Sequence, residues 1–295
     1  MTRGIIFTTI GAVCWGFSAT CIQLLVTEWA LPVEWVTSMR LIIAGPLFLL
    51  AGIATSGNHV KQIAHDRPNL VRVLLFGLLG ILGCQLAYFH CTAWTNAGTA
   101  TTLERLALLF ILGWACYTAR RLPYWKEIVG IVLALAGVFV IATQGNPSVI
   151  VLPWEGLLWG LGDAFGTACY MILPTKPLEK YSPLVITGIG MTFAALLAWA
   201  LFQPWNIAVP ITPAIVGIFF LFIAIGTIGS YACYLEGIKD CGSVLAGMLS
   251  CMVPVSAIII SAIWLGTSVS IWDIIGCALI LSMVVIVTKT TSNDS

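Results

Sequence analysis

Long apolar segments leave this chain few ways to fold. Cutting the sequence at its charged, proline-rich and polar breaks gives ten segments of about twenty residues, the length a helix needs to cross the hydrocarbon core of a bilayer. Charged residues make up only 8% of the chain, whereas a soluble domain has roughly 25%. The sequence therefore predicts an all-α membrane protein of ten transmembrane helices, with spans at 4–25, 33–54, 70–92, 98–117, 126–144, 154–174, 184–203, 213–235, 242–265 and 271–288.

The loops between these spans differ sharply in charge. Loops on one side of the membrane contain no Lys or Arg, whereas eleven of the thirteen basic residues fall on the other side: Arg3, Lys61, Arg67, Arg72, Arg120, Arg121, Lys126, Lys176, Lys180, Lys239 and Lys289. Because cytoplasmic loops carry an excess of Lys and Arg, this pattern predicts a multi-pass protein of the cytoplasmic membrane with both termini inside the cell. The formal net charge of +1 gives no reason to expect nucleic acid as a partner.

The two halves of the chain repeat each other. Trp15-Gly16 recurs 144 residues later as Trp159-Gly160, and Gly98 recurs at the same offset as Gly242. Further matches join Gly83 and Tyr88 to Gly229 and Tyr234, and the start of span 5 at Trp125 to the start of span 10 at Trp272. We therefore expect two five-helix repeats, at 1–146 and 147–295. Five is an odd number, so the second repeat enters the membrane from the opposite side, and inverted repeats of this kind are typical of transporters.

Several of these positions also resemble a known family. They are Trp15-Gly16, Arg40 within the run 39–44, the segment 95–101, the Gly-rich segment 130–138, and Gly242 followed by Pro254. Over essentially its whole length the chain resembles the EamA branch of the drug/metabolite transporter superfamily. The chain departs from the family pattern at Leu108, where proline is usual, and at Thr118-Ala119 and Gly266-Thr267, where an acidic residue is usual.

The resemblance implies a central cavity lined by spans 1–4 and 6–9. It also implies that spans 5 and 10 lie at the periphery, where they are candidates for a homodimer contact. Members of this branch typically export amino acids or related metabolites. Pro254 is a candidate gating residue, because proline removes a helical hydrogen bond and kinks the helix.

Four ionisable residues lie inside predicted spans, where a charge is costly and is expected to face the bundle interior: Arg40, Glu104, Arg105 and Asp163. Asp163 lies nine residues into span 6, about 13 Å along the helix and so close to the midplane. It is a candidate proton-binding group or anchor for a substrate ammonium, and the alternative is a carboxylate that only holds two helices together. Neighbouring helical residues point about 100° apart, so we expect Glu104 to pair with Arg40 rather than with Arg105, in a structural or gating role.

Aromatic residues form two groups. Those at span ends are expected to anchor the protein at the membrane interface, namely Trp29, Trp35, Trp94, Trp125, Trp154, Trp205 and Trp272. Those within cavity-lining spans are candidate substrate-binding residues, because a buried tyrosine hydroxyl needs a polar partner: Trp15, Tyr88, Trp159, Tyr170, Tyr231 and Tyr234.

Other chemistries lack support in the sequence. There is no phosphate-binding loop for ATP, and neither HExxH nor GxSxG occurs, so an enzyme is not expected. The ten cysteines form no CxxC pair and the three histidines do not cluster, so we expect no metal and no cofactor. The sequence favours a secondary transporter for a small metabolite, with a drug, sugar or nucleoside exporter and a non-transporting receptor as the alternatives.

Overall fold

The computed structural model describes residues 2–146, 151–230, 233–234, 237, 249–250 and 252–293. Tyr231, Lys239 and Gly242, which the sequence analysis singled out, lie outside these residues. All regular elements described are helical, and they form ten membrane-crossing segments, of which seven are at least 18 residues long and apolar and three are shorter. The prediction of a ten-helix membrane protein is confirmed.

The first repeat contains five of these segments. Span 1 is α1 (Thr2–Gln23) continued by η1 (Leu24–Glu28), and span 2 is α2 (Val33–His65). Span 3 consists of α3 (Arg67–Leu75), η2 (Phe76–Gly83) and α4 (Cys84–Trp94), span 4 of α5 (Ala97–Glu104) and α6 (Ala107–Ala119), and span 5 of α7 (Trp125–Thr143).

The second repeat contains the other five. Span 6 is α8 (Trp154–Ile172) followed by α9 (Thr175–Leu178), and span 7 is α10 (Pro183–Phe202). A short 3₁₀ turn, η3 (Pro204–Asn206), leads to span 8, which is α11 (Pro213–Ile223) continued by η4 (Ala224–Gly229). Span 9 ends with α14 (Met252–Leu265), and span 10 is α15 (Ile271–Asn293).

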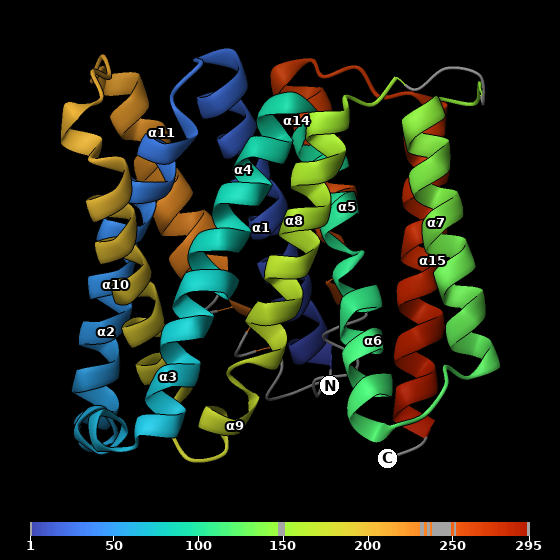
Figure 1. Ribbon diagram of the computed structural model, residues 1–295. Helices are drawn as coiled ribbons and strands as arrows, with labels where there is room; N and C mark the ends of the chain where they lie inside the picture. The colour runs from blue at the N-terminus through green and yellow to red at the C-terminus, as the bar shows by residue number, and fades with distance from the viewer. Residues whose placement is uncertain are drawn as a thin grey trace.

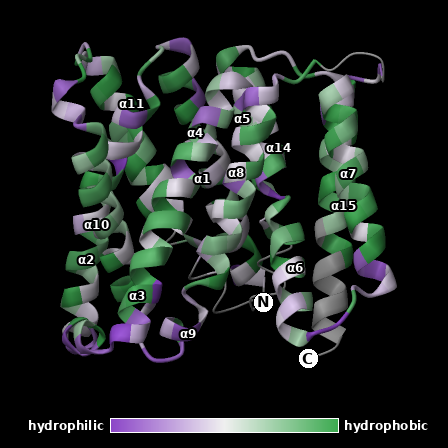
Figure 2. Ribbon diagram, viewed as in Figure 1, coloured by the Kyte–Doolittle hydropathy of each residue, from purple (hydrophilic) through white to green (hydrophobic). Residues whose placement is uncertain are grey.

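The helices stand side by side, with the N- and C-termini at the same end of the bundle (Figure 1). We call this the basic end, because Arg121 and Lys180 lie in its loops and Arg67 begins α3 there. Figure 2 shows apolar residues along the middle of the helices and polar residues at both ends. Large apolar side chains on the outside, such as Leu50, Phe220 and Ile263, are well exposed, as expected for a surface that contacts lipid.

Helix packing follows a pseudo-twofold relation between the repeats. Spans 3 and 6 pack together through α4, η2 and α8, and the matched spans 8 and 1 pack together through η4, α11 and α1. The contact of span 1 with span 9 (α1 with α14) is likewise matched by that of span 6 with span 4 (α8 with α5 and α6). The pairs α2–α10, α7–α15 and α5–α14 each join a span to its own counterpart. Exchanging every span with the one five places away therefore preserves these contacts.

Spans 3 and 8 also share an unusual local structure. Each contains a π-helical segment, and these segments end at Gly83 and Gly229, the glycines that the sequence pairs with one another. Segments of π-helix are rare and usually short. These two occur at matched positions, as the duplication predicts, whereas a third, η1 in span 1, has no counterpart in α8 of span 6.

Two helices differ from the sequence prediction. The second helix was expected to end at residue 54, but α2 runs to His65 with a kink at Ser56, and its last eleven residues are mostly exposed. Span 4 is interrupted at Arg105 and Leu106, where i→i+3 hydrogen bonds replace the α-helical pattern. Span 4 therefore has a break without the proline that is usual in the family, and Leu108 lies just beyond it.

Helices α7 and α15 form a pair at one side of the bundle (Figure 1). A Cβ on Gly137 would lie 2.8 Å from the carbonyl oxygen of Gly276, and a Cβ on Gly276 would lie 2.8 Å from that of Gly137. Only glycine permits this approach, so the small-residue faces of the two peripheral helices are used to join the repeats.

Candidate functional site

A cavity of about 370 Å³ lies inside the bundle. Every span except α7 and α15 contributes to its wall, in agreement with the arrangement that the family resemblance implies. The described residues that line it are Trp15, Ser18, Ala19, Ile22, Arg40, Gly80, Ile81, Cys84, Gln85, Tyr88, Phe89, Thr101, Glu104, Arg105, Asp163, Thr167, Tyr170, Met171, Met191, Tyr234, Ser250 and Val253.

Asp163 lies at the contact between α8 and α4. Its side chain is completely buried, and its Oδ1 accepts a hydrogen bond from the thiol of Cys84, with a distance of 3.3 Å from Sγ. Cys84 Sγ also lies 3.3 Å from the hydroxyl oxygen of Thr167, one turn along α8. The helices come this close because a Cβ on Gly166 would lie only 2.7 Å from Cys84 Cα. Within the described part of the chain, Asp163 Oδ2 has no hydrogen-bond partner.

Glu104 and Arg105 form an ion pair, with 2.7 Å between Glu104 Oε1 and Arg105 Nη2. The prediction that Glu104 would pair with Arg40 instead was wrong. The angle of about 100° separates the Cβ directions of neighbouring residues, but the long arginine side chain turns back to reach the adjacent carboxylate. Both side chains are mostly buried, so little water is available to solvate either charge separately.

Arg40 lines the cavity and contacts aromatic rings in the half of the bundle away from the basic end. Its guanidinium carbon lies 4.6 Å from the ring centroid of Phe222 and 5.8 Å from that of Phe89, distances at which a cation is attracted to the ring face. Phe222 contacts Phe219, which in turn contacts Trp35 edge to face, with 5.5 Å between the ring centroids. Aromatic side chains of spans 2, 3 and 8 thus pack together around Arg40.

Trp35 was predicted to be an interface anchor, and that prediction was wrong. Its side chain is only 8% exposed and belongs to the aromatic cluster. A position near a helix end does not determine which way the residue faces. Trp125 and Trp154 are well exposed at the ends of their helices, as expected.

The structure brings most of the predicted substrate-binding aromatic residues to the cavity. Trp15 contacts Tyr234, with ring centroids 4.7 Å apart, and both line the wall together with Tyr88 and Tyr170. Trp159 does not line the cavity: it is 39% exposed and stacks on His90 at 4.5 Å. Pro254 is buried in the first turn of α14, next to the cavity-lining Val253. Tyr231 lies outside the described residues.

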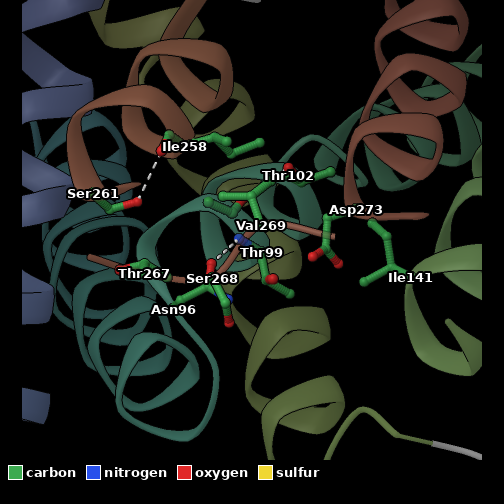
Figure 3. A pocket seen from close by; sticks show the side chains of 11 residues that line it. Asn96, Thr99, Thr102, Ile141, Ile258, Ser261, Thr267, Ser268, Val269 and Asp273 are labelled. Atoms are coloured by element: carbon green, nitrogen blue, oxygen red, sulfur yellow. Dashed lines mark hydrogen bonds between the residues drawn. The ribbon is translucent and has the colours of Figure 1, made fainter. Parts of the chain in front are cut away.

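A second, water-sized cavity of about 10 Å³ lies between α5, α7, α14 and the start of α15 (Figure 3). Polar groups around it bond one another: Asn96 Oδ1 accepts from the Thr99 backbone N–H at 2.8 Å, and Asp273 Oδ1 accepts from the Gln144 amide at 2.6 Å. These bonds cap helix starts and connect the repeats, which is a structural role.

Sequence reasoning missed the uncharged polar residues of the large cavity. Cys84, Gln85 and Thr167 line its wall beside Asp163, yet none was singled out. A signal was present in the sequence, because Cys84 and Gln85 lie four and three residues before Tyr88 and therefore share a helix face with it.

Comparison with known proteins agrees with this architecture. The model of the EamA-like transporter family matches residues 2–143 and again 154–289. The "Uncharacterized inner membrane transporter YicL" of Salmonella typhimurium is 30% identical over 97% of this chain and 95% of its own length. The "Uncharacterized transporter YwfM" of Bacillus subtilis is 25% identical over 94% of this chain and 90% of its own length.

A solved crystal structure shares the fold, with a TM-score of 0.58 at 19% sequence identity, over 96% of this chain and 98% of the other. Two matches to one family, together spanning nearly the whole chain, agree with the duplication found in the helix packing. The chain belongs to the EamA-like transporter family of the drug/metabolite transporter superfamily, and it is a membrane transporter rather than an enzyme.

Proposed function

We propose that this protein is a secondary transporter that exports a small zwitterionic or amphipathic metabolite, such as an amino acid. The observation that carries the proposal is the cavity between the repeats, which holds Asp163, Arg40 and the Glu104–Arg105 pair among aromatic side chains. Charged groups at membrane depth are costly and mark substrate or ion pathways. A site that offers both signs of charge beside apolar walls suits a molecule that itself has both signs and an apolar part.

Alternating access is the mechanism we propose, because the contacts of spans 1, 4, 6 and 9 and of spans 3 and 8 with their partners are preserved when the repeats are exchanged. In a protein built this way, rocking one repeat against the other opens a midplane site to either side. Asp163, Trp15, Tyr88, Tyr170, Tyr231 and Tyr234 are the proposed substrate-binding residues. Arg40, Glu104, Arg105 and Pro254 are the proposed gating or coupling residues. We retain Trp159 only as a residue that packs against His90 beside the site.

We place the protein in the cytoplasmic membrane with both termini inside, since the relative YicL is named as an inner membrane transporter and the basic residues gather at one end. The repeats are proposed to divide at residues 146 and 147. A homodimer contact is proposed on the outward faces of α7 and α15, where Val132, Leu135 and Ile274 are exposed.

Transport by purified protein in liposomes tests the proposal. A labelled panel of amino acids is measured with and without a pH gradient, for the wild type, for Asp163→Ala and for the control Thr192→Val, which removes a buried hydroxyl outside the cavity wall. We expect saturable flux of at least one amino acid that is lost in Asp163→Ala and kept in the control.

Other outcomes point to other functions. Flux of drugs, sugars or nucleosides without amino-acid flux would support the alternative exporter. A folded protein that moves nothing in a broad panel would support a non-transporting receptor or assembly partner.

A further inference from the structure

Three polar atoms around the large cavity are buried and lack partners. They are Asp163 Oδ2, Tyr88 Oη and Gln85 Oε1, and none has a hydrogen-bond partner among the residues described. Asp163 is 0% exposed and Tyr88 is 9% exposed, so bulk water is not a substitute. A buried polar atom without a partner costs free energy, and three of them on one cavity wall indicate that something else supplies the missing bonds.

The three side chains line the same cavity, and we refer to them together as the patch. Gln85 and Tyr88 are one helical turn apart on α4, and the thiol that bonds Asp163 belongs to Cys84, directly before Gln85. All four residues line the cavity. A ligand group that binds there therefore meets α4 on one side and α8 on the other.

We infer that this patch binds a protonated amine that still carries N–H bonds, with Asp163, Gln85 and Tyr88 as its three acceptors. The inference rests on the proposed function, because it assigns one part of the substrate to one part of that site. An ammonium group has three donors and no acceptor. Carboxylate, amide and phenol oxygens all accept hydrogen bonds, so the patch offers one acceptor for each donor.

The surrounding charges favour a cation here over an anion. Glu104, the other carboxylate of the cavity, is bonded to Arg105, which leaves the Asp163 carboxylate as the charge at the patch. Arg40, another basic residue of the cavity, has its guanidinium over the rings of Phe222 and of Phe89, the residue that follows Tyr88 on α4, so its charge is engaged by aromatic faces. Trp15 and Tyr234 offer apolar surface for the rest of the ligand.

A quaternary ammonium is not expected to bind as well. It lacks N–H groups and would leave all three oxygens unbonded, which is the costly arrangement that the ligand should relieve. The patch therefore selects primary and secondary amines over trimethylated analogues of similar shape.

Thermal unfolding of the purified full-length protein in detergent tests this without requiring transport. The probes are three primary amines, isobutylamine, isoamylamine and phenethylamine, each compared with the alcohol of the same skeleton and with its trimethylammonium analogue. A ligand that binds only the folded state raises the melting temperature with its concentration. We expect at least one amine to stabilise the wild type more than both of its analogues do.

Variants then locate the binding. Gln85→Leu and Tyr88→Phe each remove one acceptor, and we expect each to weaken amine binding about 10- to 100-fold, with Asp163→Asn weakening it at least as much. Thr37→Val is the matched control, since it also removes a buried hydroxyl without a partner but lies outside the cavity wall. If a variant does not fold, a second measurement on the wild type takes its place. A bound amine should protect the Cys84 thiol from reaction with N-ethylmaleimide, because Cys84 contacts Asp163.

The inference is overturned if every amine behaves like its alcohol, or if the three variants bind as the wild type and the control do. Its failure is separate from that of the transport proposal. Liposome flux of another substrate without any amine preference would leave the transporter standing and remove the amine site. Amine binding without flux would keep the site and count against transport of the amine.

Discussion

Trp15-Gly16 and Trp159-Gly160 occupy matched positions in the two repeats, but the structure uses them differently. Trp15 lines the cavity and contacts Tyr234, whereas Trp159 stacks on His90 away from the wall. The offset of 144 residues that aligns the two tryptophans also aligns Ala19 of the first repeat with Asp163 of the second. Both line the cavity, so one repeat presents a methyl group where the other presents a carboxylate.

The same contrast continues around Asp163. Its neighbour Thr167 corresponds to Gln23, which accepts from the Ala97 backbone N–H and donates to Thr267. Cys84 corresponds, by the offset that pairs Tyr88 with Tyr234, to Ser230, which donates to the Gly226 and Thr227 carbonyl oxygens. The duplication thus preserves helix packing, and divergence at matched positions gives the cavity its chemistry.

Moving the carboxylate to the other repeat is the strongest test of this comparison. Asp163→Ala should lower liposome flux about 10- to 100-fold, and adding Ala19→Asp should not restore it. Gln23 and Ser230 correspond there to Thr167 and Cys84, and their polar groups already form hydrogen bonds with other residues. They therefore do not offer a carboxylate at position 19 the partners that Asp163 has. Ala19→Asp in the wild type and Ala19→Asn in the Asp163→Ala background are the controls. Restored flux in the double variant would mean that the two halves of the cavity are chemically equivalent.

The two matched glycines should differ in their tolerance of a methyl group. A Cβ on Gly16 would meet the hydroxyl of Ser256 and would lie 2.8 Å from the backbone nitrogen of Ala257, so α1 and α14 must move apart. Gly16→Ala should therefore lower the free energy of unfolding by about 1–3 kcal/mol. Its matched partner Gly160 faces side chains instead of backbone: a Cβ there would lie 2.6 Å from Leu103 Cδ1, 3.2 Å from Leu103 Cβ and 3.3 Å from Cys91 Sγ.

Gly160→Ala should consequently be close to neutral, because the gain in helix propensity of about 1 kcal/mol offsets the adjustment of Leu103. Thermal unfolding of both variants in the same detergent measures the difference. Equal destabilisation would show that the two Trp-Gly positions are packed equivalently despite their different neighbours.

The sequence predicted the features that depend on pattern along the chain. The number of spans follows from the length of the apolar segments, and the duplication follows from the residues that recur. Both features persist in the fold, because every span must satisfy its polar backbone groups within a helix. Even the π-helical segments of spans 3 and 8 coincide with the glycines that marked the repeat.

Side-chain direction could not be predicted in the same way. Trp35 turns inward to Phe219, Trp159 turns away from the cavity, and Arg105 reaches back to Glu104. Each outcome depends on which neighbouring helix fills the adjacent space, and residue type alone does not contain that information. The interruption of span 4 at Arg105 was missed for a related reason, since it occurs without proline or glycine at the break.

Two contacts between the repeats, one at each end of the molecule, differ in their chemistry. At the end far from the termini, Trp35 and Phe89 of the first repeat meet Phe219 and Phe222 of the second through aromatic contacts. At the basic end the contact is polar. The Tyr181 hydroxyl donates to Asp66 Oδ2 at 2.9 Å, and the Ser182 backbone N–H donates to His59 Nδ1 at 3.0 Å. Of these two contacts, only the polar one should respond to pH.

The smallest effect we expect is a pH-dependent contribution from Tyr181. Hydrogen bonds from Asn69 and then from Tyr181 hold the pKa of the Asp66 carboxyl below its usual value. A carboxylate with a lowered pKa stabilises the fold above its unfolded pKa of about 4, and this contribution is lost as the pH falls through the folded value. Tyr181→Phe should therefore lower the melting temperature by about 1–3 °C between pH 5 and 8. The difference from the wild type should shrink below about pH 4.

The exposed Tyr117 is the matched control, because Tyr117→Phe at the same end removes a hydroxyl that faces outward. Burial, and then Asp66, raises the pKa of Tyr181, so the tyrosine stays protonated throughout the range of the measurement and any change there belongs to the carboxylate. A constant difference from pH 3 to 8 would mean that the Tyr181 hydroxyl acts through packing alone. The aromatic and the polar contact would then be equally insensitive to pH, and the contrast between them would be one of shape rather than of charge.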